Sequence, residues 1–329
     1  MDALIITKKP RLKKPYLIVA WPGMGEVAFK AAEYLIKELK AQEFARIIPD
    51  EFFYLSGSVI SSGILETPPL PQGKFYYWKN PVAKGDLSGK NDLVIFLSNA
   101  QPDLSKADSY AQNIIGLAKD LGVESIVSFA SMPQPTDHTQ DSGVWFVATE
   151  QKIKESLKKY NFSPLVEGQI SGMNGLFLGI AKKAKLKGFC LLGEIPLYTI
   201  QIENPKASAA VLAALGKILN IQINVAPLKE QAQVMENEIN KLLEYLKLGN
   251  SGVSAPIGEE EVELIKKTLS QLTNLPVSVK EKIEKLFGES RLDIAKAKEL
   301  KVELDKWNVY KEYEDKFLDL FRKNTDKGN

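Results

Sequence analysis

Residues 16–26 read YLIVAWPGMGE and contain the clearest indication of the fold. The first five residues are continuously apolar, which is typical of a strand buried on both faces of a sheet. The turn WPGMG follows, and an amphipathic helical pattern then runs over residues 26–40. A buried strand that leads through a short turn into a helix is the first part of a β-α-β unit. This segment therefore predicts an α/β fold.

Other apolar runs alternate with helical patterns as far as about residue 225. Continuous apolar strands separated by helices predict a three-layer α/β sandwich with a mostly parallel mixed sheet. The aromatic run FYYW at residues 75–78 predicts an additional hairpin or antiparallel strand. We expect strands at residues 93–97, 125–130, 144–148 and 188–192, and helices at residues 105–121, 150–160, 174–185 and 205–219.

The charge density divides the chain into two parts. Residues 259–329 contain 31 Asp, Glu, Lys and Arg residues in 71 positions, a higher density than in the part before them. A stretch rich in glycine, serine and proline near residues 248–258 indicates a linker. We therefore expect an α/β core domain at residues 1–228 and a C-terminal helical region at residues 229–329. The helical region either packs on itself or docks on a partner.

The composition excludes several classes of function. The 329 residues contain 43 Lys and Arg against 41 Asp and Glu, so the basic excess of a nucleic-acid groove is missing and we expect no nucleic acid as partner. One cysteine and one histidine exclude a disulfide framework and most metal sites and hydrolytic triads. No apolar run approaches the ~18–20 residues that cross a bilayer, so we expect no membrane partner and a cytoplasmic protein.

The WPGMG turn is the first candidate site. Gly23 and Gly25, with Met24 between them, would let backbone N–H groups approach an anion at the start of a helix. The third glycine of a dinucleotide fingerprint is missing. The alternative is a tight turn that packs the following helix onto the sheet.

Two further candidates lie later in the chain. Residues 167–175, EGQISGMNG, place the hydroxyl of Ser171 and the amide of Asn174 at the start of a predicted helix. The alternative is that these glycines serve close packing of helix on sheet. Glu194 follows a buried strand at the edge where open α/β sheets bind ligands. It is either a general base or hydrogen-bond acceptor, or a structural carboxylate that caps a helix or holds a subunit contact.

Two isolated residues with reactive side chains carry less weight. His138 lies in a proline-rich loop, and we expect a solvated surface residue. Cys190 lies within an apolar strand, and we expect a small core residue. The sequence indicates no metal site and no cofactor.

Four segments together resemble the proteasome assembly chaperone 2 family. They are the strand, WPGMG turn and helix near residue 20, the proline-rich loop SMPQPTDH at 131–138, EGQISGMNGLFLGIAKKAKLKGFCLLGE at 167–194 and NPKASAAVLAALGKILNIQINVAPL at 204–228. The resemblance implies a fold similar to nucleoside phosphorylases and a homo-oligomer, a trimer or a tetramer. It also implies a proteasome-like or other protein as partner. Relatives that engage proteasome rings can end in a hydrophobic-Tyr-any tripeptide, whereas this sequence ends TDKGN.

The leading functional hypothesis is a non-catalytic oligomeric assembly chaperone or adaptor. The alternative is a protein or enzyme that binds a nucleoside, a nucleotide or another small anion in a phosphorylase-like crevice. In that case Gly23 and Gly25 would face the anion, and the side chains of Ser171, Asn174 and Glu194 would contact a sugar or base. No Arg or His lies in these glycine-rich segments to clamp phosphate, which favours the first hypothesis.

Overall fold

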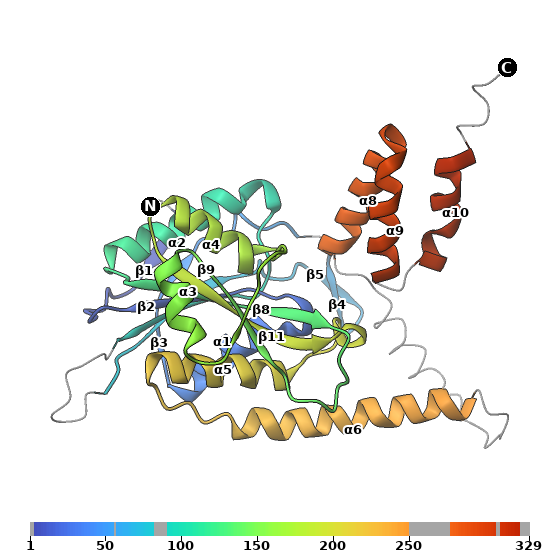
Figure 1. Cartoon of the computed structure of the whole chain (residues 1–329). Coiled ribbons are helices and arrows are strands. Elements are labelled where there is room, and N and C mark those ends of the chain that lie inside the picture. The colour runs from blue at the N-terminus through green and yellow to red at the C-terminus, as the bar shows by residue number, and fades with distance from the viewer. Residues whose placement is uncertain (1–2, 56, 82–90, 250–276, 307–309, 323–329) are drawn as a thin grey trace. The chain divides into compact units, whose positions relative to one another are not determined.

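A mixed sheet forms the centre of the protein (Figure 1). The computed structural model describes residues 3–55, 57–81, 91–249, 277–306 and 310–322. Within them, nine strands form one sheet in the order β1-β3-β6-β7-β2-β8-β11-β9-β10. These strands are β1 (Leu4–Ile6), β2 (Tyr16–Ala20), β3 (Gln42–Ile47), β6 (Gly73–Trp78), β7 (Leu93–Ser98), β8 (Ser125–Gln134), β9 (Val144–Ala148), β10 (Ser163–Pro164) and β11 (Gly188–Pro196).

The four central strands β7, β2, β8 and β11 run parallel, as the continuous apolar runs predict. Antiparallel strands flank them: β6 pairs with β7, and β9 pairs with β11. The FYYW run lies in β6, so the prediction of an antiparallel strand there is confirmed. The sheet is mixed because an antiparallel strand lies on each side of the parallel centre.

Helices cover both faces of this sheet, which gives the predicted three layers. On one face α1 (Val27–Glu38) packs against α5 (Pro205–Leu219), and on the other α2 (Ala107–Asp120) packs against α4 (Met173–Lys183). Side chains of β2 alternate between the layers, because successive residues of a strand point to opposite faces. Leu17 and Val19 accordingly belong to the apolar cluster shared with α2 and α4.

The sequence also marks where α5 begins. The Asn204 side chain accepts a hydrogen bond from the Ala207 amide at 2.9 Å, and Pro205 occupies the first turn. An amide cap followed by proline is the favoured helix start, since the proline removes an N–H that has no partner inside the helix. The shorter α3 (Gln151–Lys158) contacts β9 and β10 at the edge of the sheet.

Contacts divide the described chain into two units. The first contains the sheet and its helices, up to Pro196 and then Glu203–Tyr245, and the second contains Leu197–Ile202 and the residues from Leu246 onward. The predicted domain boundary at residue 228 falls within the first turn of α6 (Ala226–Gly249). This boundary stays a prediction. Most of the expected linker at 248–258 lies outside the described residues.

The second unit has an apolar core of its own. Its α-helices that lie wholly within the described residues are α8 (Val277–Leu292), α9 (Ala297–Lys306) and α10 (Tyr310–Arg322). Lys282 of α8 donates to the buried carboxylate of Glu303 on α9 at 2.8 Å. Buried apolar side chains from all three helices pack together: Ile283, Leu286, Phe287, Ala297, Leu300, Leu304, Phe317 and Leu320. In the described part of the chain, no helix has both the length and the apolar character needed to span a bilayer.

Candidate functional site

The WPGMG turn joins β2 to α1 through a sharp change of backbone direction. Gly25 has φ +61°, a left-handed conformation that glycine adopts without steric cost. A side chain at Gly25 would also come within 3.3 Å of the Ile195 Cδ1 atom. The Glu26 amide donates to the Gly23 carbonyl at 2.9 Å, which closes the turn. Gly25 therefore has a structural reason to be glycine.

Two side chains from other parts of the chain form hydrogen bonds with the backbone of this turn. Asn174 of α4, only 5% exposed, accepts from the Trp21 amide at 3.0 Å and donates to the Trp21 carbonyl at 2.9 Å. Gln101 donates to the Pro22 carbonyl at 2.7 Å and accepts from the Met173 amide at 2.9 Å. Both amide atoms of Asn174 are thus used by the protein's own backbone. The sequence analysis missed Gln101, which carries no local signal of this contact.

Glu26 follows the WPGMG turn, and its surroundings alter the pKa of its carboxyl. Partial burial raises the pKa of its carboxyl, Lys30 and the Gly23 backbone partly offset the rise, and Glu203 adds to it. Lys30 lies 3.2 Å from the Glu203 carboxylate and 3.9 Å from the Glu33 carboxylate, so this cation is paired with two acids.

Glu194 is held by hydrogen bonds at the start of β9. One carboxylate oxygen accepts from the Trp145 indole at 2.6 Å and the other accepts from the Gly143 amide at 3.1 Å. A side chain at Gly143 would lie 2.5 Å from this carboxylate, so a larger residue there would displace the Glu194 carboxylate from its present position. The observed contacts are those of a structural acceptor that fastens β9 to β11.

The structure brings only some of the predicted site residues together. A side chain at Gly23 would reach the Asn174 Nδ2 atom at 3.4 Å, so these two are neighbours. Met24 is half-buried, and Ser171 is exposed in the segment before α4. Glu194 has its partners on β9 instead. Binding of an anion or nucleoside by Gly23, Met24, Gly25, Ser171, Asn174 and Glu194 stays a prediction.

His138 and Cys190 give one correction and one confirmation. His138 is only 7% exposed, so the expectation of a solvated surface residue is wrong. Its Nε2 atom lies 2.8 Å from Asn240 Oδ1, because α6 packs over the loop. Cys190 is buried in β11 as expected, and burial raises the pKa of its thiol to about 12.

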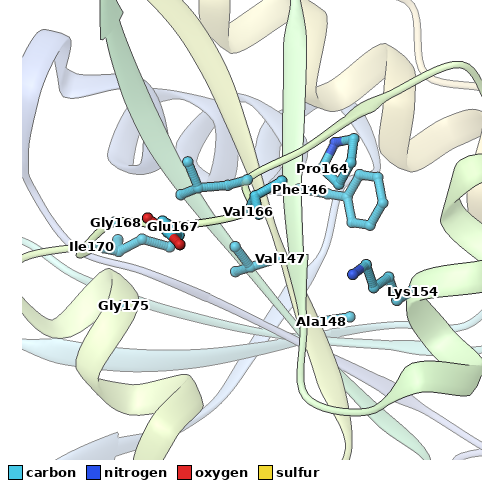
Figure 2. Close-up of a pocket in the computed structure, with 11 residues that line it drawn as sticks. Phe146, Val147, Ala148, Lys154, Pro164, Val166, Glu167, Gly168, Ile170 and Gly175 are labelled. Atoms are coloured by element: carbon cyan, nitrogen blue, oxygen red, sulfur yellow. The ribbon is translucent and has the colours of Figure 1, made fainter.

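A cavity of about 450 Å³ lies beside the outer edge of β9 (Figure 2). Its apolar lining includes Phe146 and Val147 of β9 and Ile170 of the loop between β10 and α4. Two charged residues also line it, Lys154 of α3 and Glu167. Part of the wall comes from the glycine-rich segment 167–175 that the sequence analysis selected, but from residues other than Ser171 and Asn174.

Comparisons with known proteins agree with this fold. An uncharacterized protein of Methanocaldococcus jannaschii is 27% identical over 269 residues, which cover 79% of this chain and 97% of that protein. The crystal structure of Pyrococcus furiosus PbaB, an archaeal proteasome activator, is 27% identical with a TM-score of 0.61, and covers 74% of this chain and 99% of that one. P. furiosus PbaA, an archaeal homologue of proteasome-assembly chaperone, is 25% identical with a TM-score of 0.56, and covers 76% of this chain and 95% of that one.

The family follows from the sequence match together with the fold. The sequence pattern of the PAC2 family matches residues 17–243, a span that begins in β2 and ends in α6. This span contains the WPGMG turn, the Asn174 contact and the cavity beside β9. It covers more than half of the chain, and the protein therefore belongs to the PAC2 family.

Proposed function

We propose that this protein is a non-catalytic oligomeric assembly chaperone or adaptor that acts on proteasome subunits. One observation carries the proposal: the 25% identity to PbaA, an archaeal homologue of proteasome-assembly chaperone, extends over 95% of that chain. The likeness to PbaB, an archaeal proteasome activator, supports the proteasome as the partner.

The hydrogen bonding of the WPGMG turn supports the non-catalytic part of this proposal. A catalytic group must present an atom to a substrate. Asn174 uses both amide atoms on the Trp21 backbone, and Glu194 uses both carboxylate oxygens on Trp145 and Gly143. These contacts hold both side chains to neighbouring segments of the fold, which favours a structural role over a catalytic one.

An exposed apolar hairpin supports the protein-binding part. The strands β4 (Val59–Ser61) and β5 (Ile64–Glu66) form a two-stranded sheet separate from the main one. Their apolar side chains are 51–71% exposed: Val59, Ile60, Ile64 and Leu65. An isolated hairpin is marginally stable in water, and an exposed apolar patch marks an interaction surface.

A second copy of this chain is the partner that we propose for this hairpin. Both strands of a two-stranded sheet have a free edge, and a free edge can pair with a free edge of another copy. The double variant Ile60→Ser/Leu65→Ser should therefore lower the oligomeric mass measured by light scattering without changing the circular dichroism spectrum. Val234→Ser removes an apolar side chain that is 63% exposed on α6 and serves as the control. If the double variant keeps its mass, another surface joins the subunits.

The proposed function is tested by reconstitution. Separately purified archaeal proteasome α and β subunits would be mixed with and without this protein, and the yield of assembled particle measured on native gels. A higher yield supports an assembly chaperone. If the yield is unchanged but the peptidase activity of preassembled particles rises, the protein is an activator and the assembly proposal is wrong. If neither changes, the proteasome proposal fails.

A further inference from the structure

The cavity beside β9 has the size of a small-molecule site. Its volume of about 450 Å³ falls within the range of about 300–1,000 Å³ that is usual for ligand pockets. Its walls come from β9, from α3 and from residues 164–175, all within the first unit. Neither the WPGMG turn nor the apolar hairpin takes part in it, so the function proposed above leaves the cavity unexplained.

The cavity forms where two strands separate. β10 runs parallel to β9 and pairs only with Trp145 and Phe146. The last hydrogen bond of this pairing runs from the Leu165 amide to the Phe146 carbonyl at 2.9 Å. β9 continues to Ala148, whereas the chain after Leu165 no longer pairs with β9. The cavity lies between these two segments.

The backbone of β9 contributes polar groups to this space. The Thr149 amide donates to the Gly188 carbonyl, and the Glu194 amide donates to the Gly143 carbonyl. Because the direction of peptide groups alternates along an antiparallel strand, the residues between these contacts point alternately toward β11 and away from it. The N–H and C=O groups of Ala148 point away from β11, toward the cavity that Ala148 lines.

Two opposite charges complete the lining. Lys154 is half-buried and Glu167 is exposed, and neither forms an ion pair with another residue in the described part of the chain. Figure 2 shows them on opposite sides of Val147, with the Lys154 ammonium directed from α3 toward that side chain. A cation and an anion on two sides of an apolar floor would bind the two charged ends of a zwitterion.

We propose that this cavity binds a small zwitterionic ligand with an apolar body, an apolar amino acid or dipeptide. The ligand carboxylate lies at Lys154 and its ammonium lies at Glu167. Its apolar side chains pack on Phe146, Val147 and Ile170, and a dipeptide amide also reaches the peptide groups of Ala148. The proposal is independent of the proteasome role.

Calorimetric titration with four defined ligands tests this assignment. The ligands are L-leucine, L-leucyl-L-leucine, its C-terminal amide and its N-acetyl derivative. Saturable binding of leucine or of the dipeptide supports the proposal, and the tighter of the two shows whether the site takes one residue or two. For the dipeptide, each blocked form should bind about tenfold more weakly, because each block removes one charge-assisted contact.

Single variants then assign each end of the ligand. Lys154→Met should abolish the preference for the free acid over the amide, and Glu167→Gln should abolish the preference for the free amine over the acetylated form. Lys152→Met removes an exposed lysine from the same helix and should leave both preferences unchanged. The proposal is overturned if no ligand binds saturably in the millimolar range, if blocked and unblocked forms bind equally, or if Lys154→Met behaves like Lys152→Met.

Discussion

Asn174 links two segments that lie 153 residues apart in the chain. β2 ends at Ala20, so the Trp21 peptide groups lie beyond its paired residues while the Trp21 side chain is fully buried. Buried backbone groups need hydrogen-bond partners. The Asn174 amide supplies both a donor and an acceptor, as a neighbouring strand would.

The variant Asn174→Ala measures what this contact contributes. It leaves two buried backbone groups of Trp21 without partners, which should lower the free energy of unfolding by about 2–4 kcal/mol. Chemical denaturation followed by circular dichroism gives the value. Asn113→Ala, which removes an amide that donates to the Ser109 carbonyl on the surface of α2, should change it by less than about 1 kcal/mol. Equal losses in the two variants would contradict the structural role of Asn174.

Glu26 predicts a dependence of stability on pH. Because burial raises the pKa of its native carboxyl above the ordinary 4.5, the native state binds this proton more tightly than the unfolded state does. Stability from this group is therefore present at low pH and is lost as the pH rises through the raised pKa. Glu26→Gln should raise the melting temperature at neutral pH and have no effect at a pH below both pKa values. The exposed Glu51→Gln should have no effect at either pH; the same shift in both variants would show that net charge is the cause.

The first part of α6 is fastened to the core through Lys206. This side chain of α5 donates to the carbonyls of His138 and Gln140, and it lies 2.8 Å from the Glu236 carboxylate on α6. The two charged side chains are partly buried, with the Lys206 side chain 23% exposed and the Glu236 side chain 18% exposed. One ammonium group thus joins α5, the loop after β8 and α6.

Lys206→Met should loosen α6 without unfolding the sheet. Loss of these contacts should cost about 1–3 kcal/mol, and amide hydrogen exchange should quicken in residues 229–242 while β2 and β8 keep their protection. Lys229→Met, at an exposed position on α6, is the control. Faster exchange throughout the sheet would mean that Lys206 supports the whole fold instead.

Local sequence patterns predicted the central strands and the helices of the α/β core, but not the edge strands β1, β3 and β10 and not the site. β2 and β9 begin and end where their apolar runs do, and α5 begins at its predicted cap. In contrast, β8 and β11 extend to Gln134 and Pro196, past their apolar runs, because they pair with each other along that length. That extension depends on tertiary pairing, which a local pattern does not contain.

The candidate site shows the same limit. The sequence analysis selected residues 167–175 as a candidate ligand-binding segment from its glycines and polar side chains, and other residues of that segment line the cavity. It missed Lys154 and the β9 edge, because these meet the segment only after the sheet has formed. It also placed His138 on the surface, because the packing of α6 over a loop about 100 residues earlier leaves no trace in the local pattern.

The whole molecule combines a PAC2-family α/β unit with a separate helical unit. The α/β unit contains the segments that match the family, and its exposed hairpin is the surface through which we expect copies to associate. The buried apolar side chains of the helical unit pack within its own three helices, while Val302, Leu318 and Phe321 are exposed. We assign subunit association to the α/β unit because of its exposed hairpin.

Native mass spectrometry of the purified protein mixed with proteasome α subunits tests the proposed role. We predict a mass equal to several copies of this chain together with at least one α subunit, and a homo-oligomer, a trimer or tetramer, when the protein is measured alone. The individual masses of this chain and the α subunit, with no species containing both, would contradict the account.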